Sequence, residues 1–138
     1  MYAAEFDYVR ASSIEEAISM KGANDDSSLL AGGHSLIPAM KLRLSTPQKL
    51  IDISGLDQLK KISKNGSYIS IGALCTHKQC TESDIIQSNC PALSDAASVI
   101  GDSHVRNKGT SGDVLSHSDP PADFPGVVMA LIGTIFVD

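Results

Sequence analysis

The chain has 138 residues, of which 42% are hydrophobic and 20% are charged, and its net charge is −5. A chain of this length buries one core, so we expect one domain or part of one, and the acidic balance argues against nonspecific nucleic-acid binding. No apolar run approaches the roughly 20 residues of a membrane span and no secretory signal precedes the first motif, so we expect a cytoplasmic protein without a membrane span.

The first 54 residues are predicted to form a small three-stranded α/β subdomain. A capping box at residues 13–16 opens an amphipathic helix that ends before Gly22. A strand is expected at residues 29–31, a helix at 36–42 and a second strand at 50–53. The apolar run before Gly32 is typical of a short buried strand, and the glycines follow its end.

From residue 55 to residue 138 the pattern indicates a second subdomain, with a mixed, largely antiparallel sheet and helices, so that the fold class is α+β. Alternating residues around Asn65-Gly66 predict a hairpin. Helices are expected from Thr76, over residues 91–100, and over 124–131 with Asp123 as a cap. Residues 102–121 lack a sustained period and predict an extended loop, and residues 135–137 predict a strand.

Two glycine-bearing segments have the composition of anion-binding loops. Residues 30–36 (LAGGHSL) lead from a strand through two glycines into a helix that Ser35 can cap, and residues 109–114 (GTSGDV) follow about eighty residues later. Such turns leave backbone N–H groups directed at one spot, where a pyrophosphate binds. The alternative for the first is a plain strand-to-helix turn. Together the two segments suggest a dinucleotide held from both sides in one cleft.

These segments resemble the FAD-binding medium subunit of molybdenum hydroxylases, with the carbon monoxide dehydrogenase and aldehyde oxidoreductase type nearest. The resemblance runs from Phe6 to the last residue and rests on residues 31–44, 50–53, 71–77, 100–110 and 117–123. It implies the α+β FAD-binding fold of the vanillyl-alcohol oxidase and molybdenum hydroxylase type, in truncated form. It also implies FAD as cofactor, no catalytic acid, base or nucleophile, and no metal site in this chain.

The resemblance implies that the subunit relays electrons from iron-sulfur clusters to FAD and an external acceptor. The partners would be a molybdopterin-containing large subunit and an iron-sulfur small subunit. The expected cofactor-binding residues are Leu30, Ala31, Gly32, Gly33, His34, Ser35, Leu36, Ile100, Gly101, Thr110, Ser111, Gly112, Asp113, Val114 and Asp123. From pattern alone, Ile100 and Gly101 can equally be a buried helix end, and Asp123 a plain helix cap.

Two departures from the family keep other interpretations open. Relatives carry paired glycines where this chain has Gly112-Asp113, and a small polar residue where it has Val114. A carboxylate facing a pyrophosphate weakens binding through like-charge repulsion. Family subunits are also about twice as long, so the chain is a fragment, one half of a split subunit completed by a separate chain, or a decayed relative without FAD that serves as an assembly or interaction module.

Overall fold

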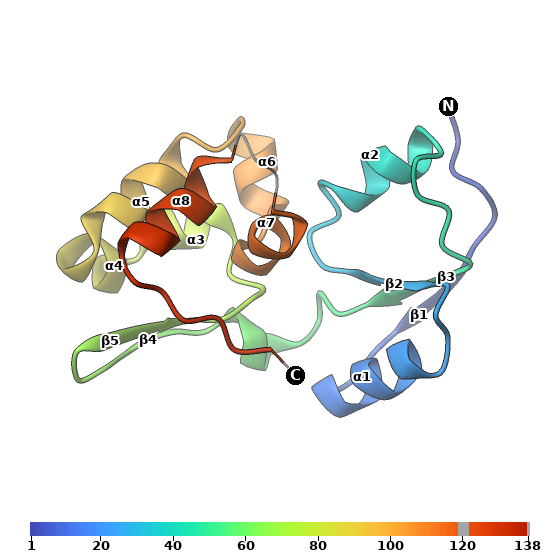
Figure 1. The fold of residues 1–138 in the computed structure, drawn as a ribbon, viewed down its shortest axis with the longest axis horizontal. Coiled ribbons are helices and arrows are strands. Elements are labelled where there is room, and N and C mark those ends of the chain that lie inside the picture. The colour runs from blue at the N-terminus through green and yellow to red at the C-terminus, as the bar shows by residue number, and fades with distance from the viewer. Residues whose placement is uncertain (119–121, 138) are drawn as a thin grey trace. The chain divides into compact units, whose positions relative to one another are not determined.

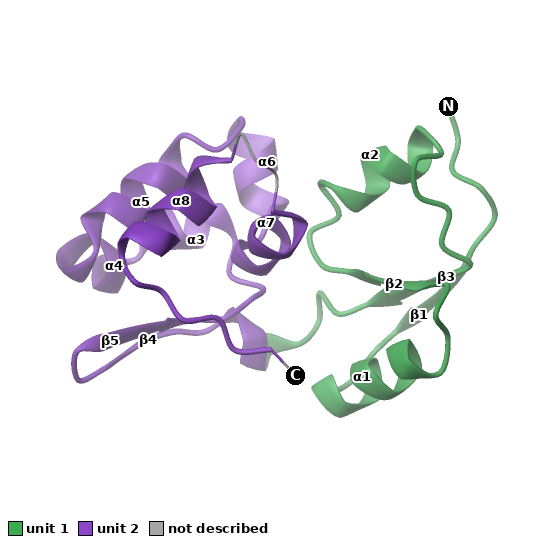
Figure 2. Cartoon of the chain, viewed as in Figure 1, with its two compact units in different colours: residues 1–57 green, residues 58–138 purple. Residues whose placement is uncertain are grey.

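The computed structural model describes residues 1–118 and 122–137, which divide into two compact units. Unit 1 comprises residues 1–57 and unit 2 residues 58–138 (Figure 2). Each unit is described by itself below. None of the helices in the described part has the length and apolar character that crossing a membrane requires.

Unit 1 is a three-stranded parallel sheet with two connecting helices (Figure 1). Its elements in chain order are β1 (Asp7–Arg10), α1 (Ile14–Gly22), β2 (Ser27–Leu30), α2 (Leu36–Lys41) and β3 (Lys49–Asp52). The strand order is β1-β3-β2, so β3 is central, and Leu50 and Ile51 on it are buried. Ser13 caps α1, since its Oγ accepts the Glu16 N–H at 3.1 Å, but the predicted capping box is incomplete, because the Glu16 carboxylate accepts from Ser12 instead of from the Ser13 N–H.

The central strand ends in a buried carboxylate with three partners. Asp52 accepts hydrogen bonds from the Tyr8 hydroxyl and from the Ser54 N–H at 2.8 Å, and Arg10 Nε lies 4.0 Å away. Burial alone would raise the pKa of Asp52, but the hydrogen bonds and the Arg10 charge outweigh it and hold the pKa below its ordinary value. This cluster ties the ends of β1 and β3 together.

Unit 2 combines a two-stranded hairpin with helices that enclose a second core. A 3₁₀ turn (Asp57–Lys60) joins the units, and the hairpin consists of β4 (Ile62–Asn65) and β5 (Tyr68–Ile71). Gly66 has φ +60° in the two-residue turn, as the predicted hairpin requires. The helices are α3 (His77–Glu82), α4 (Asp84–Asn89), α5 (Pro91–Ser98), α6 (Ser103–Lys108), α7 (Ser111–His117) and α8 (Asp123–Ala130).

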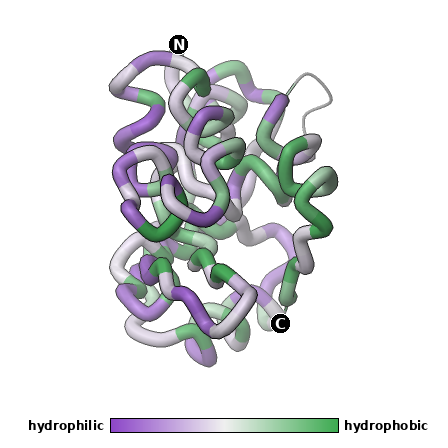
Figure 3. Tube along the Cα trace, turned by 90° about the vertical axis from the view of Figure 1, so that its left-hand side faces the viewer, coloured by the Kyte–Doolittle hydropathy of each residue, from purple (hydrophilic) through white to green (hydrophobic). Residues whose placement is uncertain are grey.

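Cys75, which precedes α3, and buried residues of α3, α4, α5 and α8 form the core of unit 2; the helical members are Cys80, Ile86, Leu93, Ala96, Ala97 and Phe124. Thr76 and Gln79 form the predicted capping box of α3. The segment from α8 toward the C-terminus is strongly hydrophobic (Figure 3), yet several of its side chains are exposed, among them Met129, Ile132 and Phe136. The α+β fold class predicted from the sequence is confirmed, with a two-stranded ladder in unit 2 among the described residues.

Several local expectations are wrong. Residues 102–118 are not an extended loop, because Asp102 and Thr110 each cap a short helix, α6 and α7. Residues 119–121, also assigned to that loop, lie outside the described residues. The expected strand at 135–137 is absent from the described residues, which are irregular and exposed there.

Two predicted caps and one predicted burial also differ. Ser35 stands at the N-cap of α2 in helical conformation, and its side chain makes no capping hydrogen bond. Ala122 is the N-cap of α8, and Asp123 is the first helical residue. Leu29 on β2 is 45% exposed and Leu30 is only half-buried, so the apolar run before the glycines is not fully buried. The sequence interpretation also missed β1 and α4.

Candidate functional site

The glycine loop of unit 1 leaves backbone donors unpaired. It joins β2 to α2, and Gly33 has φ +78°, a left-handed conformation that favours glycine. Within the described residues, the N–H groups of Gly32, Gly33 and His34 have no hydrogen-bond acceptor. Since α2 has only six residues, these local donors rather than a long helix dipole provide the attraction for an anion.

The second glycine segment is differently built, because its donors are engaged within unit 2. The Ser111 N–H donates to the Cys75 carbonyl at 2.9 Å, and the Gly112 N–H donates to the Ala73 carbonyl at 2.8 Å. The Asp113 N–H donates to Thr110 Oγ1 at 3.3 Å, which caps α7. The segment is therefore a docked helix start, and its contact with a pyrophosphate stays a prediction.

Buried hydroxyls reinforce this docking. Thr110 and Ser111 are 4% and 5% exposed, and Ser111 Oγ donates to the Gly72 carbonyl at 2.9 Å. A Cβ on Gly112 would lie 2.8 Å from both the Cβ and the carbonyl oxygen of Ala73. Gly112 is thus needed for close packing of α7 against residues 72–75. The two glycine segments belong to different units, so a shared cleft also stays a prediction.

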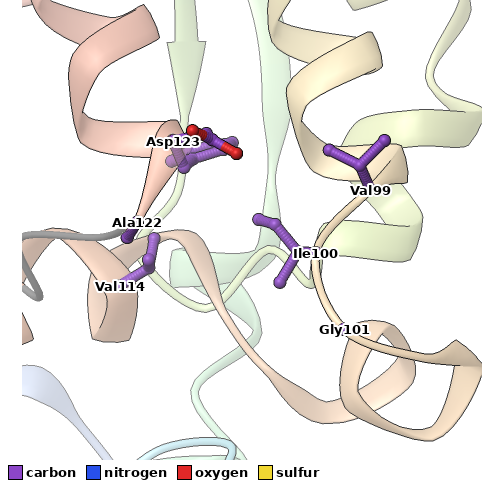
Figure 4. A pocket seen from close by; sticks show the side chains of 7 residues that line it. Val99, Ile100, Gly101, Val114, Ala122 and Asp123 are labelled. Carbon is purple, nitrogen blue, oxygen red and sulfur yellow. The ribbon is translucent and has the colours of Figure 1, made fainter.

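A pocket of about 240 Å³ lies within unit 2. It is lined by Val99, Ile100, Gly101, Val114, Ala122, Asp123 and Phe124. Figure 4 shows residues 99–101 on one side of it and Val114, Ala122 and Asp123 on the other. The structure therefore brings together four predicted site residues, Ile100, Gly101, Val114 and Asp123.

Sequence reasoning missed Val99, Ala122 and Phe124 as lining residues. Val99 directly precedes the predicted Ile100, and Ala122 and Phe124 flank the predicted Asp123. Adjacency in sequence to a predicted site residue was therefore the signal that could have identified them. Phe124 is 2% exposed, and its ring packs edge to face on His77 with centroids 5.7 Å apart. The aromatic wall of the pocket is thus anchored in the core of unit 2.

Among the side chains that line the pocket, only that of Asp123 is polar. The Asp123 carboxylate is exposed, stands in the first turn of α8, and has no hydrogen-bond or ion-pair partner among the described residues. Apolar side chains beside one carboxylate are compatible with a flat aromatic group that carries hydroxyls.

The turn at residues 100–101 is held by a basic side chain that was not predicted. Arg106 Nη1 donates to the Gly101 carbonyl at 2.7 Å and to the Ile100 carbonyl at 3.2 Å. Gly101 has φ +50°, and a Cβ there would lie 2.9 Å from Val105 Cβ. Elsewhere in the described part of the chain, no three His, Cys, Asp or Glu side chains gather to hold a metal ion.

The fold and pocket are those of an α+β ligand-binding domain, and comparison with known proteins identifies its family. The sequence profile described as "FAD binding domain in molybdopterin dehydrogenase" matches residues 4–138. The chain belongs to this family of FAD-binding domains.

Individual relatives agree with that assignment. The glyceraldehyde dehydrogenase medium chain of Sulfolobus acidocaldarius is 42% identical over 137 residues, which are 99% of this chain and 49% of the relative. The carbon monoxide dehydrogenase medium chain of Hydrogenophaga pseudoflava is 41% identical over 127 residues, 91% of this chain and 44% of the relative. The chain thus spans about half the length of these curated relatives.

Solved structures show the same likeness. Carbon monoxide dehydrogenase from Hydrogenophaga pseudoflava superposes with a TM-score of 0.92 at 41% identity, over 94% of this chain and 46% of that one. Quinoline 2-oxidoreductase from Pseudomonas putida 86 gives a TM-score of 0.88 at 31% identity, over 91% of this chain and 44% of that one. The predicted family and its cofactor, FAD, are therefore confirmed.

The described residues fit FAD in part. The unpaired N–H groups of residues 32–34 suit a phosphate, and the pocket of unit 2 suits the edge of a flat ring. At about 240 Å³ the pocket is smaller than the roughly 300–1,000 Å³ of typical ligand sites, so it is too small for the whole of FAD. The engaged donors of residues 111–113 are the poorest match.

Proposed function

We propose that this chain is the FAD-binding portion of the medium subunit of a molybdenum-containing hydroxylase. When bound, FAD would supply the redox chemistry by which the subunit relays electrons from iron-sulfur clusters to an external acceptor. The partners are a molybdopterin-containing large subunit and an iron-sulfur small subunit. The observation that carries the proposal is the convergence of Ile100, Gly101, Val114 and Asp123 on one pocket.

The residues of the chain bind and orient the cofactor. The N–H groups of Gly32, Gly33 and His34 donate to a phosphate, and Ile100 and Phe124 offer apolar surface to the ring. The Asp123 carboxylate accepts hydrogen bonds from the hydroxyls of the flavin side chain. Placing the flavin against an apolar wall excludes water from one of its faces, and the redox chemistry itself belongs to the cofactor.

A second candidate function is an assembly or interaction module that has lost FAD. Two observations favour it: the donors of residues 111 and 112 are engaged within unit 2, and Asp113 adds a negative charge beside them. In this alternative the glycine segments serve packing alone. FAD binding by the chain distinguishes the two functions.

The deciding experiment is a titration of the ¹⁵N-labelled chain with FAD, followed by NMR. We expect a colourless preparation with weak binding, because these residues span only about half the length of the curated relatives and each ~1.4 kcal/mol lost is a factor of ten in affinity. The amide signals of residues 32–34 and 100–101 should shift. If no amide shifts up to millimolar FAD, the interaction module replaces the enzyme subunit.

Two variants at position 113 sharpen this test. Asp113→Gly restores the paired glycines and removes the charge, so FAD should bind more tightly, with a gain that shrinks as salt screens the repulsion over ~8 Å. Asp113→Asn is the matched control, because it removes the charge without adding a glycine. Equal gains for both variants assign the effect to charge, and no gain for either shows that Asp113 does not face the pyrophosphate.

A further inference from the structure

The turn that forms one wall of the pocket has carbonyl groups without helical partners. Helix α5 ends at Ser98, and Val99 is its C-cap. The last carbonyls of a helix receive no hydrogen bond from an N–H group of that helix. A basic side chain near the C-terminal end commonly donates to them instead. Here the chain reverses at Gly101, whose φ of +50° leaves the Ile100 and Gly101 carbonyls beyond the helix.

Arg106 binds both of these carbonyls through one nitrogen, Nη1. A guanidinium is planar and permanently charged, so its hydrogen bonds to carbonyls are charge-assisted and fixed in direction. Asp102 fixes the helix that carries Arg106, because its carboxylate accepts from the His104 and Val105 N–H groups at 2.8 and 3.0 Å. These hydrogen bonds hold the pKa of Asp102 below its ordinary value.

We propose that Arg106 is a positioning residue of the flavin-ring pocket, which holds the Ile100–Gly101 turn against α6 so that the turn presents a rigid wall to the ring. The inference rests on the proposed function, since it concerns the same cofactor. Arg106 acts through the turn and not by touching FAD. It therefore affects binding of the ring more than binding of the adenine and pyrophosphate.

The chain offers a matched control in Lys108 on the same helix. Lys108 is exposed, lies two residues farther along α6, and has no hydrogen-bond or ion-pair partner among the described residues. Lys108→Met removes one positive charge as Arg106→Met does, but leaves the turn intact. Arg106→Lys keeps the charge and loses the planar donor fork, so it separates geometry from charge.

The test uses two probes on the ¹⁵N-labelled chain: flavin mononucleotide, which contains the ring without adenine, and ADP, which contains adenine and pyrophosphate without the ring. NMR titration gives both dissociation constants, and circular dichroism gives the Tm of each variant. For Arg106→Met we expect roughly tenfold weaker binding of flavin mononucleotide, from the loss of two charge-assisted hydrogen bonds, with ADP binding unchanged. Arg106→Lys should retain part of the affinity, and Lys108→Met all of it.

Each outcome decides between specific alternatives. If Arg106→Met lowers the Tm but binds flavin mononucleotide like the unmodified chain, Arg106 is only structural and the inference is wrong while the proposed function stands. Equal weakening of both probes also overturns it, because the effect is then not confined to the ring pocket. If the unmodified chain binds neither probe, the proposed function is wrong and the inference fails with it.

Discussion

Replacing Gly112 by alanine tests whether this glycine serves packing or ligand approach. The new Cβ would lie 2.8 Å from the Ala73 Cβ and 2.8 Å from its carbonyl oxygen, the acceptor of the Gly112 N–H. Helix α7 must move away, which weakens its hydrogen bonds to residues 73 and 75. Overpacking of this kind costs about 1–3 kcal/mol, and the helix propensity of alanine returns up to ~1 kcal/mol. We expect a net loss of about 0–2 kcal/mol in the free energy of unfolding, after the full offset of ~1 kcal/mol.

Gly126→Ala is the matched control, because Gly126 also lies in a helix of unit 2 and its Cβ would meet nothing within 4 Å. That substitution should stabilise the chain by up to ~1 kcal/mol. The assay is urea unfolding followed by circular dichroism at 222 nm, a signal to which the helices of unit 2 contribute strongly. If Gly112→Ala proves as stable as Gly126→Ala, α7 does not dock on residues 73–75 as described and the packing role is wrong.

Two further predictions concern the glycine loop and the buried thiols. Gly33→Val should destabilise the chain by about 1–2 kcal/mol, since φ is +78°, and should weaken ADP binding, which unfolding and titration measure. Burial, and then the nearby Cys75, raises the pKa of Cys80 from 9.0 to about 12, so the folded chain keeps this thiol protonated. Its contribution to stability is complete below pH 9 and is lost as pH rises toward 12, by about 1.4 kcal/mol per pH unit, which urea unfolding across this range checks. At pH 8 a thiol reagent should modify Cys90 and spare Cys75 and Cys80 until the chain unfolds.

The sequence predicted those structural features that depend on interactions between residues a few positions apart. The N-cap at Ser13, the capping box at Thr76 and the hairpin at Gly66 depend on neighbours in sequence, and all three are present. The sequence predicts a loop at residues 102–118 because helices of six and seven residues are too short to show a hydrophobic periodicity. Their caps, Asp102 and Thr110, were the available signal. The exposed tail at 135–137 shows that apolar composition does not by itself make a strand.

Four residues of the candidate pocket were named from the sequence, but three others and the geometry of the pocket were not. The family resemblance supplied Ile100, Gly101, Val114 and Asp123, which converge on one pocket. It did not supply Arg106, because a side chain that binds carbonyls six residues back leaves no compositional mark. The hydrogen-bond state of the glycine segments was equally hidden. Both are glycine-rich, but only a three-dimensional structure shows which N–H groups already have acceptors.

In the proposed arrangement, the free energy of FAD binding has one contribution from the flavin ring and another from the pyrophosphate. The pocket of unit 2 is too small for a dinucleotide, so ring and pyrophosphate make separate contributions to affinity. In the proposed arrangement, Gly33 and Asp113 affect binding of the pyrophosphate, and Arg106 affects binding of the ring. Effects on independent parts of a ligand add as free energies and multiply as affinities. The Asp113→Gly and Arg106→Met changes should therefore combine for FAD as the product of their separate effects, whereas a shared contact would make the combination depart from that product.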